Sequence, residues 1–464
     1  MSPSADPMLH VTLKSAHCGP RAEYVTQALL VEGYGMKVTW EEDRGMGPWT
    51  SLSVEGQERV RWSNHPLLRE ESGLETEVMW GTWSTHSKEE LALHVPCWTA
   101  MDPQDGVLPF DPLAVSFHGL VCWEEQAGRL PLDVHGRPSP QGFPWCKAEG
   151  MATWGGHRLA MAQQHRWPWV DLMWNELLSE AWSPAEVQFH LEPTFDIDVA
   201  FKHAGRSRTK SWLLSARDVV LGRWSVVKER FQVLSGRLSD PYDTYGWIRE
   251  VHREEPLTWF VLAANRHRPY DVGLDPEGEA LPALVESLGH HVAGSKVCWH
   301  PGHAALDHPD RLGLEGKRFW SWDGTFGGMV RTHFLRGNPR RWWPQLEALG
   351  IGADASLGWA KDVGYRSGVS RPFRAYDLAS DRPLQVNIHP LVVMDSAMKN
   401  GLNWSPEEAK EHVDAMVAVA SEVGGVWMSC FHNTSVSDHE EWKGWRATYL
   451  HMVECVRRGA KRTL

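Results

Sequence analysis

The 464-residue chain is poor in several features that mark whole classes of protein. No apolar run approaches the roughly 20 residues that a membrane-spanning helix needs. The first residues, M-S-P-S-A-D-P-M-L-H, lack the charged-then-apolar pattern of a signal peptide. The seven cysteines have no paired spacing, which argues against a disulfide framework or a cysteine-type zinc site. These absences predict a reduced, cytoplasmic protein without a membrane span.

Positive charge is also in short supply. The chain carries 47 basic against 59 acidic residues, a net charge of −12, and it has no concentrated basic run. Nucleic acid is therefore not an expected partner. The sequence also has no internal repeat and no low-complexity tract, and 42% of its residues are hydrophobic. We expect a globular protein whose length favours two domains.

The sequence pattern changes near residue 186. Residues 1–185 are predicted to form a smaller mixed α/β domain, with a helix from Arg21, an alternating strand at M-K-V-T-W-E and a stretch rich in proline and glycine from Asp102 to Gly156. In residues 186–464 short strands alternate with helices, which is typical of a β/α fold. The candidate strands are V-Q-F-H-L, L-T-W-F-V-L-A-A-N, V-A-G-S-K-V-C-W-H, L-Q-V-N-I-H and G-V-W-M-S-C-F-H.

One helix has clear boundaries in the sequence. Ser405 stands at its N-cap, Pro406 at its first position and Glu408 at its third, which is the arrangement of a capping box. A Gly-Gly pair, Gly424 and Gly425, marks its end. A helix is therefore predicted between these residues, just before the last candidate strand.

Aspartate or histidine stands at the end of four candidate strands: Asp196 and Asp198, His300, His389, and His432. In parallel β/α barrels the active site is built at the C-terminal ends of the strands. Two aspartates one residue apart in an extended chain point to the same face. They repel each other unless a cation or a shared proton relieves them. A site holding a cation is therefore predicted where these strand ends meet.

The chemistry that fits such a site is metal-assisted hydrolysis. A catalytic zinc or similar ion keeps three ligands of the aspartate and histidine type and one open position for water. The ion lowers the pKa of that water and polarises a substrate carbonyl. One carboxylate can bind the ion while its neighbour takes a proton as general base. A histidine across the site can protonate the leaving amine or alcohol.

At these residues the sequence resembles the polysaccharide deacetylases with NodB homology (carbohydrate esterase family 4), in a divergent bacterial branch with an extra N-terminal domain. T-F-D-I-D resembles the first motif of the family, which implies that Asp196 is the catalytic base and Asp198 a metal ligand. W-H-P-G-H resembles a degenerate second motif and implies that His300 is a metal ligand. G-Y-R-S-G-V-S-R-P-F resembles the third motif, in which Arg366 would hold the base aspartate ionised. W-M-S-C-F-H-N-T resembles the last motif and makes His432 the catalytic acid.

The resemblance implies a fold and an activity. The fold would be α/β: a distorted, incomplete (β/α) barrel of NodB type with about seven strands, preceded by the smaller N-terminal domain. The activity would be that of a hydrolase acting on non-peptide carbon–nitrogen bonds, which removes acetyl groups from an acetylated (amino)sugar polymer or its precursor. The cofactor would be one divalent metal ion, zinc in the first place, with cobalt and nickel as alternatives. The resemblance leaves the sugar and the oligomeric state open.

The second motif departs from the pattern of the family, which has two histidines four residues apart. His303 follows His300 at three residues, and Pro301 and Gly302 argue against a helix there. His333, in R-T-H-F-L-R, is the preferred third ligand and His303 the alternative. If neither binds, the protein would be a non-catalytic carbohydrate-binding or scaffold protein that keeps the deacetylase fold.

The catalytic acid also has an alternative. L-Q-V-N-I-H-P resembles a common form of the last motif and would nominate His389. His432 is preferred because it follows the capped helix and its strand, where the order of the family places the acid. Asp395, in V-V-M-D, either lines the same pocket or caps a turn.

Overall fold

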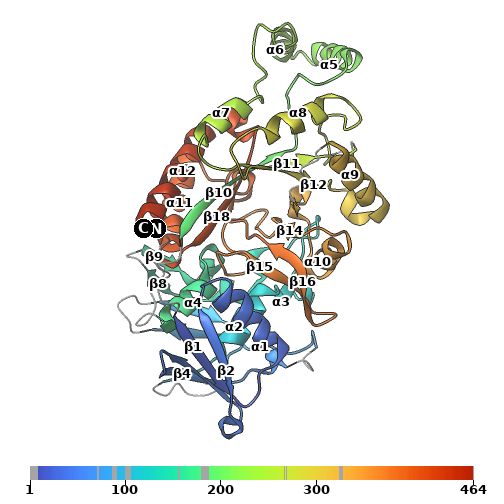
Figure 1. Ribbon diagram of the computed structural model, residues 1–464. Helices are drawn as coiled ribbons and strands as arrows, with labels where there is room; N and C mark the ends of the chain where they lie inside the picture. Colours follow the sequence, from blue (N-terminus) through green and yellow to red (C-terminus); the bar gives the residue numbers. More distant parts are fainter. Residues whose placement is uncertain are drawn as a thin grey trace, which may run out of the picture.

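The structure is a computed structural model that describes residues 9–462 except 70–72, 86–90, 100–105, 155–156, 179–187, 266, 268 and 323–327. In these ranges the chain forms one large and one smaller sheet, each with its own helices (Figure 1). The predicted α/β class is confirmed. The predicted domain boundary between residues 185 and 186 lies outside the described residues and stays a prediction.

The large sheet has nine strands in the described chain, in the order β15-β16-β14-β13-β12-β11-β10-β18-β17. From β16 to β17 every neighbouring pair is parallel, and only β15 runs antiparallel to its neighbour. The strands are β10 (Phe189–Ile197), β11 (Thr258–Leu262), β12 (Lys296–His300), β13 (Met329–Val330), β14 (Ala353–Asp354), β15 (Phe373–Asp377), β16 (Arg382–Ile388), β17 (Val393–Met394) and β18 (Gly425–His432).

This sheet curls into an open half-barrel whose two edges are β15 and β17. Its central strands are continuous apolar runs, because both faces are covered: all five residues of β11 and four of five in β12 are buried. The incomplete barrel is therefore present, with nine strands where the resemblance implied about seven. Besides a projecting pair described below, the helices of this half in the described chain are α7 (Tyr245–Val251), α8 (Ala280–Gly289), α9 (Pro309–Trp322), α10 (Pro339–Ala348), α11 (Pro406–Val423) and α12 (Trp445–Arg462).

The sequence predicted the start of α11 correctly. Ser405 accepts a hydrogen bond from the amide of Glu408, and the Glu408 side chain accepts one from the amide of Ser405. Gly424 ends the helix with a φ of +70°, a conformation that glycine adopts without strain. The helix then leads directly into β18.

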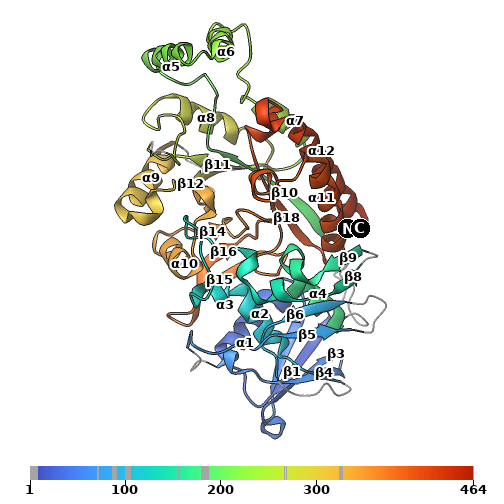
Figure 2. The same ribbon diagram turned by 180° about the vertical axis from the view of Figure 1, so that it is seen from behind.

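The N-terminal part is built around a five-stranded sheet in the order β2-β1-β3-β4-β7. Two short hairpins, β5–β6 and β8–β9, accompany it (Figure 2). The strands are β1 (His10–Ser15), β2 (Lys37–Glu42), β3 (Trp49–Val54), β4 (Gln57–Ser63), β5 (Gly81–Ser84), β6 (Ala92–Val95), β7 (Val107–Leu108), β8 (Met151–Trp154) and β9 (His157–Ala160). The helices are α1 (Pro20–Val25), α2 (Pro112–Leu120), α3 (Trp123–Gln126) and α4 (Trp169–Leu178).

The N-terminal part packs against the connection between β14 and β15, and one hydrophobic core runs through both parts. Asp171 of α4 accepts hydrogen bonds from the amide and the hydroxyl of Ser370. Gly364 has a φ of +117°, and a Cβ at this position would lie 2.3 Å from the carbonyl oxygen of His165. The backbones of the two parts approach closely here because Gly364 has no side chain.

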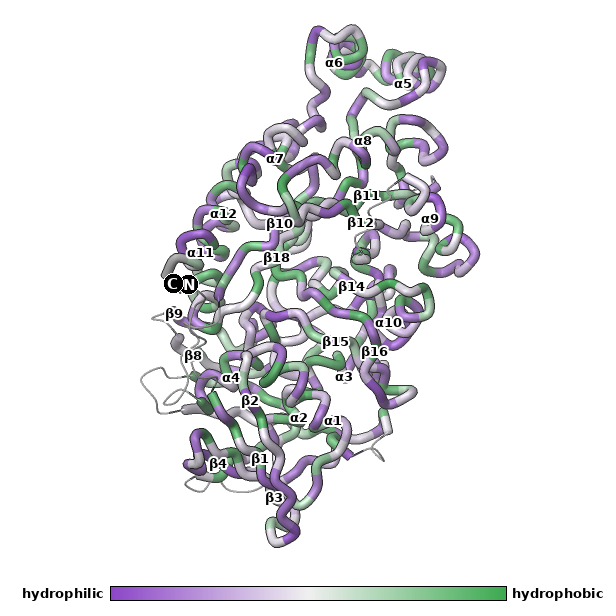
Figure 3. Tube along the Cα trace, viewed as in Figure 1, coloured by the Kyte–Doolittle hydropathy of each residue, from purple (hydrophilic) through white to green (hydrophobic). Residues whose placement is uncertain are grey.

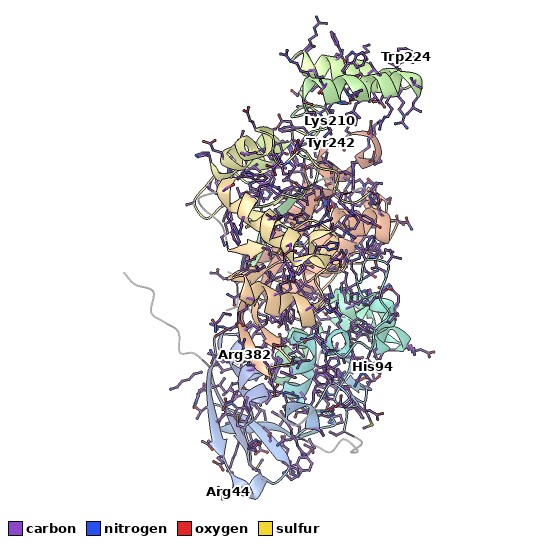
Figure 4. The ribbon with its side chains drawn as sticks, turned by 90° about the vertical axis from the view of Figure 1, so that its right-hand side faces the viewer. Arg44, His94, Lys210, Trp224, Tyr242 and Arg382 are labelled. Carbon is purple, nitrogen blue, oxygen red and sulfur yellow. The ribbon has the colours of Figure 1, made fainter. Side chains whose placement is uncertain are left out.

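A helical hairpin projects from the large sheet on the side away from the N-terminal part (Figures 1 and 4). It consists of α5 (Arg208–Val220) and α6 (Trp224–Leu234), inserted after β10. Among the described helices, none combines the length and the apolar character that crossing a membrane requires.

Candidate active site

Six neighbouring strands of the large sheet bring polar side chains to one edge of the half-barrel. Because β17, β18, β10, β11, β12 and β13 are parallel, their C-terminal ends lie together. The side chains at or after these ends are Asp395 (β17), His432 (β18), Asp196 and Asp198 (β10), Asp271 (β11), His300 (β12), and Arg331 and His333 (β13). Residues from all over the second half thus meet in one place.

Asp198, His300 and His333 form a compact group of possible metal ligands. One donor atom from each lies within 4.8 Å of the other two. Nε2 of His300 is 3.2 Å from Oδ1 of Asp198, and Nε2 of His333 is 3.3 Å from Oδ2. The structure therefore brings together the aspartate, the histidine and the preferred third histidine of the sequence analysis.

The hydrogen bonds of the two histidines suit a metal site. Nδ1 of His300 donates to the carbonyl oxygen of Arg331 at 2.6 Å, and Nδ1 of His333 donates to Asp271 at 2.9 Å. A neutral imidazole that donates through Nδ1 keeps its lone pair on Nε2, which here faces Asp198. Oδ1 of Asp198 is buried without an aligned hydrogen bond. A carboxylate and two imidazole nitrogens are a donor set that zinc and similar ions accept, so the residues fit the implied metal.

The charges around Asp198 favour its ionised form. Burial alone would raise its pKa, but His333, His300 and His432 lower the pKa well below its usual range. Burial likewise disfavours the cationic form of His333, yet Asp198 and Asp271 raise its pKa to about 9. Without a metal, the ionised Asp198 is therefore paired with a protonated His333, and a bound cation would take the place of the proton on Nε2 of His333.

Asp196 is held by a buried arginine. Nη1 of Arg331 donates to Oδ1 of Asp196 at 2.8 Å and to the hydroxyl of Thr194 at 2.6 Å. Arg331 also donates through Nε to a backbone carbonyl and lies over the ring of Phe260. Burial would raise the pKa of Asp196, but Arg331 above all, with His300, lowers it. Asp196 is therefore ionised, and its Oδ2, 3.9 Å from His300, faces the metal-ligand group.

His432 stands on the other side of Asp198. Its Nε2 is 3.4 Å from Oδ2 of Asp198, and its Nδ1 is 2.8 Å from Oδ1 of Asp395. Burial disfavours the imidazolium, but Asp395 and Asp198 raise the pKa of His432 well above its ordinary value. The sequence left two roles open for Asp395, lining the pocket or capping a turn. In the structure its carboxylate orients this imidazole.

The prediction that Arg366 contacts Asp196 is wrong. Arg366 lies in the connection between β14 and β15 and forms a two-pronged ion pair with Glu125 of the N-terminal part. Arg331 occupies the position beside Asp196 that was expected for Arg366. The motif around Arg366 is a packing surface, because the N-terminal part covers it with a matching carboxylate.

The two alternative histidines lie elsewhere. The ring of His303 stacks on Tyr270 with 4.0 Å between centroids, and burial and the charge of Arg336 lower its pKa to about 4. Its backbone amide donates to Asp271, so His303 supports the site through the main chain. His389 lies 3.7 Å from Glu192. Neither histidine is among the described residues that line the cavity at the site.

A second group, Asp196, Cys430 and His432, also satisfies the distances of a metal site. Burial raises the pKa of the Cys430 thiol well above its usual value, so the thiolate that metals bind is disfavoured. Asp196 is in addition paired with Arg331. The group around Asp198 is therefore the better candidate.

The site opens into a cavity of about 390 Å³. One wall carries unusual backbone: Phe334 and Leu335, directly after His333, have φ values of +65° and +54°. Such strain costs roughly 1–3 kcal/mol per residue and persists only where the surroundings enforce it. Arg137 of the N-terminal part, itself paired with Asp133, donates to the carbonyl oxygen of Phe334 and lines the cavity. The N-terminal part thus supports the loop that positions His333.

Sequence reasoning missed Arg331 and Asp271. Arg331 stands two residues before His333 and directly after β13. This strand has only two residues and shows no periodicity in the sequence. Asp271 lies nine residues beyond the end of β11, in a loop without a recognisable motif. The sequence does carry a signal for Arg331, because it stands in the run R-T-H-F-L-R with the preferred third histidine.

Comparison with known proteins gives distant structural likenesses, of which two are described. No protein-family model and no curated protein sequence matches the chain. A solved structure from Mycobacterium smegmatis, described as a "putative polysaccharide deacetylase", is 16% identical with a TM-score of 0.37, over 58% of this chain and 85% of that one. A "putative glycoside hydrolase/deacetylase" from Parabacteroides distasonis is 13% identical with a TM-score of 0.32, over 60% and 68%. Both are too distant to bear on activity, so the residues of the site have to carry the proposal.

Proposed function

We propose that this protein is a metal-dependent hydrolase that removes acetyl groups from an acetylated amino sugar, as a polymer or a precursor. The observation that carries the proposal is the convergence of Asp198, His300 and His333, with Asp196 and His432 beside them. The acetylated sugar as substrate class comes from the resemblance of T-F-D-I-D and the later motifs to NodB-type deacetylases. We further propose that the fold belongs to that type.

The site divides the chemistry among its own residues. Asp198, His300 and His333 would hold a divalent ion, which when bound supplies Lewis-acid polarisation of the acyl carbonyl and acidifies water. Asp196, kept ionised by Arg331, takes a proton from the attacking water through Oδ2. His432 gives a proton from Nε2 to the leaving amine, while Asp395 receives the hydrogen bond from its Nδ1. The acetyl group would lie in the cavity, between Asp196 and His432.

The direct test is metal content together with acetate release. Purified protein reconstituted with zinc, cobalt or nickel is expected to hold about one ion per chain, as a three-ligand site requires. Asp198→Ala and His300→Ala are expected to lose that ion, measured by elemental analysis after gel filtration. Acetate release from N-acetylglucosamine oligomers should stop on chelation and return when the metal is restored.

His303→Ala is the matched control, because it removes a nearby histidine whose side chain lies outside the proposed ligand group. It should keep the ion. Wild-type protein that takes up no metal would contradict the hydrolase mechanism. A non-catalytic carbohydrate-binding protein would then be the favoured hypothesis. Glycan binding that persists in the presence of a chelator would support it.

A milder change should weaken the site without removing a ligand. Asp271→Asn takes away the carboxylate that orients His333. Residues that orient metal ligands typically contribute 10- to 100-fold in affinity, so the dissociation constant for zinc is expected to rise by about that factor. Competition with a chromogenic chelator measures it. Asp275→Asn, in the same loop but exposed, should leave the affinity unchanged.

A further inference from the structure

The hairpin of α5 and α6 presents large apolar side chains to solvent. Trp212 is 72% exposed and Trp224 is 65% exposed. Other exposed apolar side chains of this segment are Leu213, Val219, Val220, Leu221, Phe231, Leu234 and Leu238. Figure 3 shows hydrophobic stretches on both projecting helices. Burying this many large apolar groups against a partner would be strongly favourable.

The apolar side chains form faces. Residues seven apart lie on the same side of an α-helix, two turns from each other. Such pairs are Trp212 and Val219, Leu213 and Val220 on α5, and Trp224 and Phe231 on α6. Each helix is therefore amphipathic with its apolar face outward.

The hairpin does not use these faces to hold itself together. The buried residues of the two helices are polar: Ser211 and Asp218 on α5 and Arg230 on α6. Arg230 donates to Asp218 at 2.6 Å and to the hydroxyl of Ser215 at 3.0 Å. An ion pair therefore lies buried between the two helices, while the largest apolar side chains of the hairpin are exposed.

The charge of the hairpin is opposite to that of the chain. Residues 206–238 contain eight basic and two acidic residues, a net charge of +6 in a chain of net charge −12. Arg208, Arg223, Lys228 and Arg237 are exposed among the apolar side chains. Surface helices that combine tryptophan, phenylalanine and leucine with lysine and arginine are typical of membrane-surface segments, and the long basic side chains can reach the headgroups while their stems stay beside the apolar groups. Anionic lipids attract such a segment.

The foot of the hairpin is joined to the rim of the cavity. Glu229 of α6 is 2.6 Å from Nε2 of His203 and 2.9 Å from Nε2 of His439. Lys202 forms an ion pair with Glu440 at 2.7 Å. Trp442, two residues further on, lines the cavity. A series of side-chain contacts therefore runs from α6 to the segment that carries a residue lining the cavity.

We propose that the α5–α6 hairpin docks this protein peripherally on a membrane surface that contains anionic lipids. Its apolar faces enter the interface between headgroups and acyl chains, and its basic side chains bind the lipid phosphates and carboxylates. A second copy of the hairpin is a poorer partner, because two surfaces of charge +6 repel each other. The docking does not depend on the proposed hydrolase activity.

The test is flotation of the full chain with vesicles. Wild-type protein is expected to float with phosphatidylcholine vesicles containing about one third phosphatidylglycerol and to stay in solution with phosphatidylcholine alone. Trp212→Ser/Trp224→Ser should weaken binding at least tenfold, because it removes the two largest inserted side chains. Arg208→Gln/Arg223→Gln/Lys228→Gln/Arg237→Gln should weaken it by at least the same factor, and salt should weaken wild-type binding.

Leu132→Ser/Val134→Ser is the matched control, since both residues are exposed and apolar but lie in the N-terminal part. It should bind vesicles as the wild type does, and circular dichroism should show all variants folded. Failure of the wild type to float with anionic vesicles would overturn the proposal, as would unchanged binding by the tryptophan variant. Dimerisation without lipid that the tryptophan variant abolishes would identify a second copy as the occupant and overturn it too.

Discussion

An Asp196→Asn variant is expected to lose between about 10² and 10⁴ of the kcat for acetate release while keeping its metal. Asparagine has nearly the same volume and can still accept the hydrogen bond from Arg331, although the buried guanidinium loses its charged partner, so folding is checked by circular dichroism. It cannot take the proton from water, because its amide has no basic oxygen at neutral pH. The loss therefore separates proton transfer from metal binding.

The measurement combines kcat with metal content on the same preparation. Asp111→Asn is the matched control: Asp111 is equally buried, but its carboxylate caps α2 through Oδ1 and accepts from the amide of His65 through Oδ2, so the substitution disturbs only the N-terminal part. It should keep both metal and activity. If Asp196→Asn kept the kcat of the wild type, Asp196 would not be the base.

An Arg366→Met variant is expected to lower the free energy of unfolding by about 3–5 kcal/mol. The substitution leaves the carboxylate of Glu125 buried without its partner, at the contact between the N-terminal part and the large sheet. The cost arises mainly from this unpaired charge. Urea unfolding followed by tryptophan fluorescence measures it.

Two further variants test whether the loss of stability comes from the unpaired buried charge of Glu125. Glu125→Gln/Arg366→Met removes both charges and should recover most of the lost stability, because no unpaired ion remains. Arg382→Met breaks an exposed ion pair with Glu347 and should cost no more than about 1 kcal/mol. Equal losses for Arg366→Met and Arg382→Met would contradict the explanation by burial.

Much of the large sheet could be predicted from local sequence. β11, β12 and β18 lie within candidate strands, because they have at least five residues with strong apolar character, and β16 overlaps the candidate L-Q-V-N-I-H, whose apolar residues alternate. β13, β14 and β17 escaped prediction because two residues give no periodicity. They form strands because neighbouring strands supply the hydrogen bonds, on both sides for β13 and β14 and on one side for the edge strand β17.

The α5–α6 hairpin shows the same limit for helices. Apolar residues at helical spacing predict a buried face, and Trp212, Val219, Trp224 and Phe231 have that spacing. Whether such a face is covered depends on which segments fold over it. Here the described chain leaves it open, so exposure is a property of the tertiary structure alone.

The sequence by itself determined the aspartate pair, since Asp196 and Asp198 share a face in any extended strand. It also determined the start of α11, whose cap involves residues three apart. Only the tertiary structure placed His333 and not His303 beside Asp198, placed Arg331 in the position expected for Arg366, and brought Asp271 and Asp395 behind their histidines. The physical reason is distance along the chain: ligands and their supports come from six strand ends, and only the parallel sheet brings those ends together.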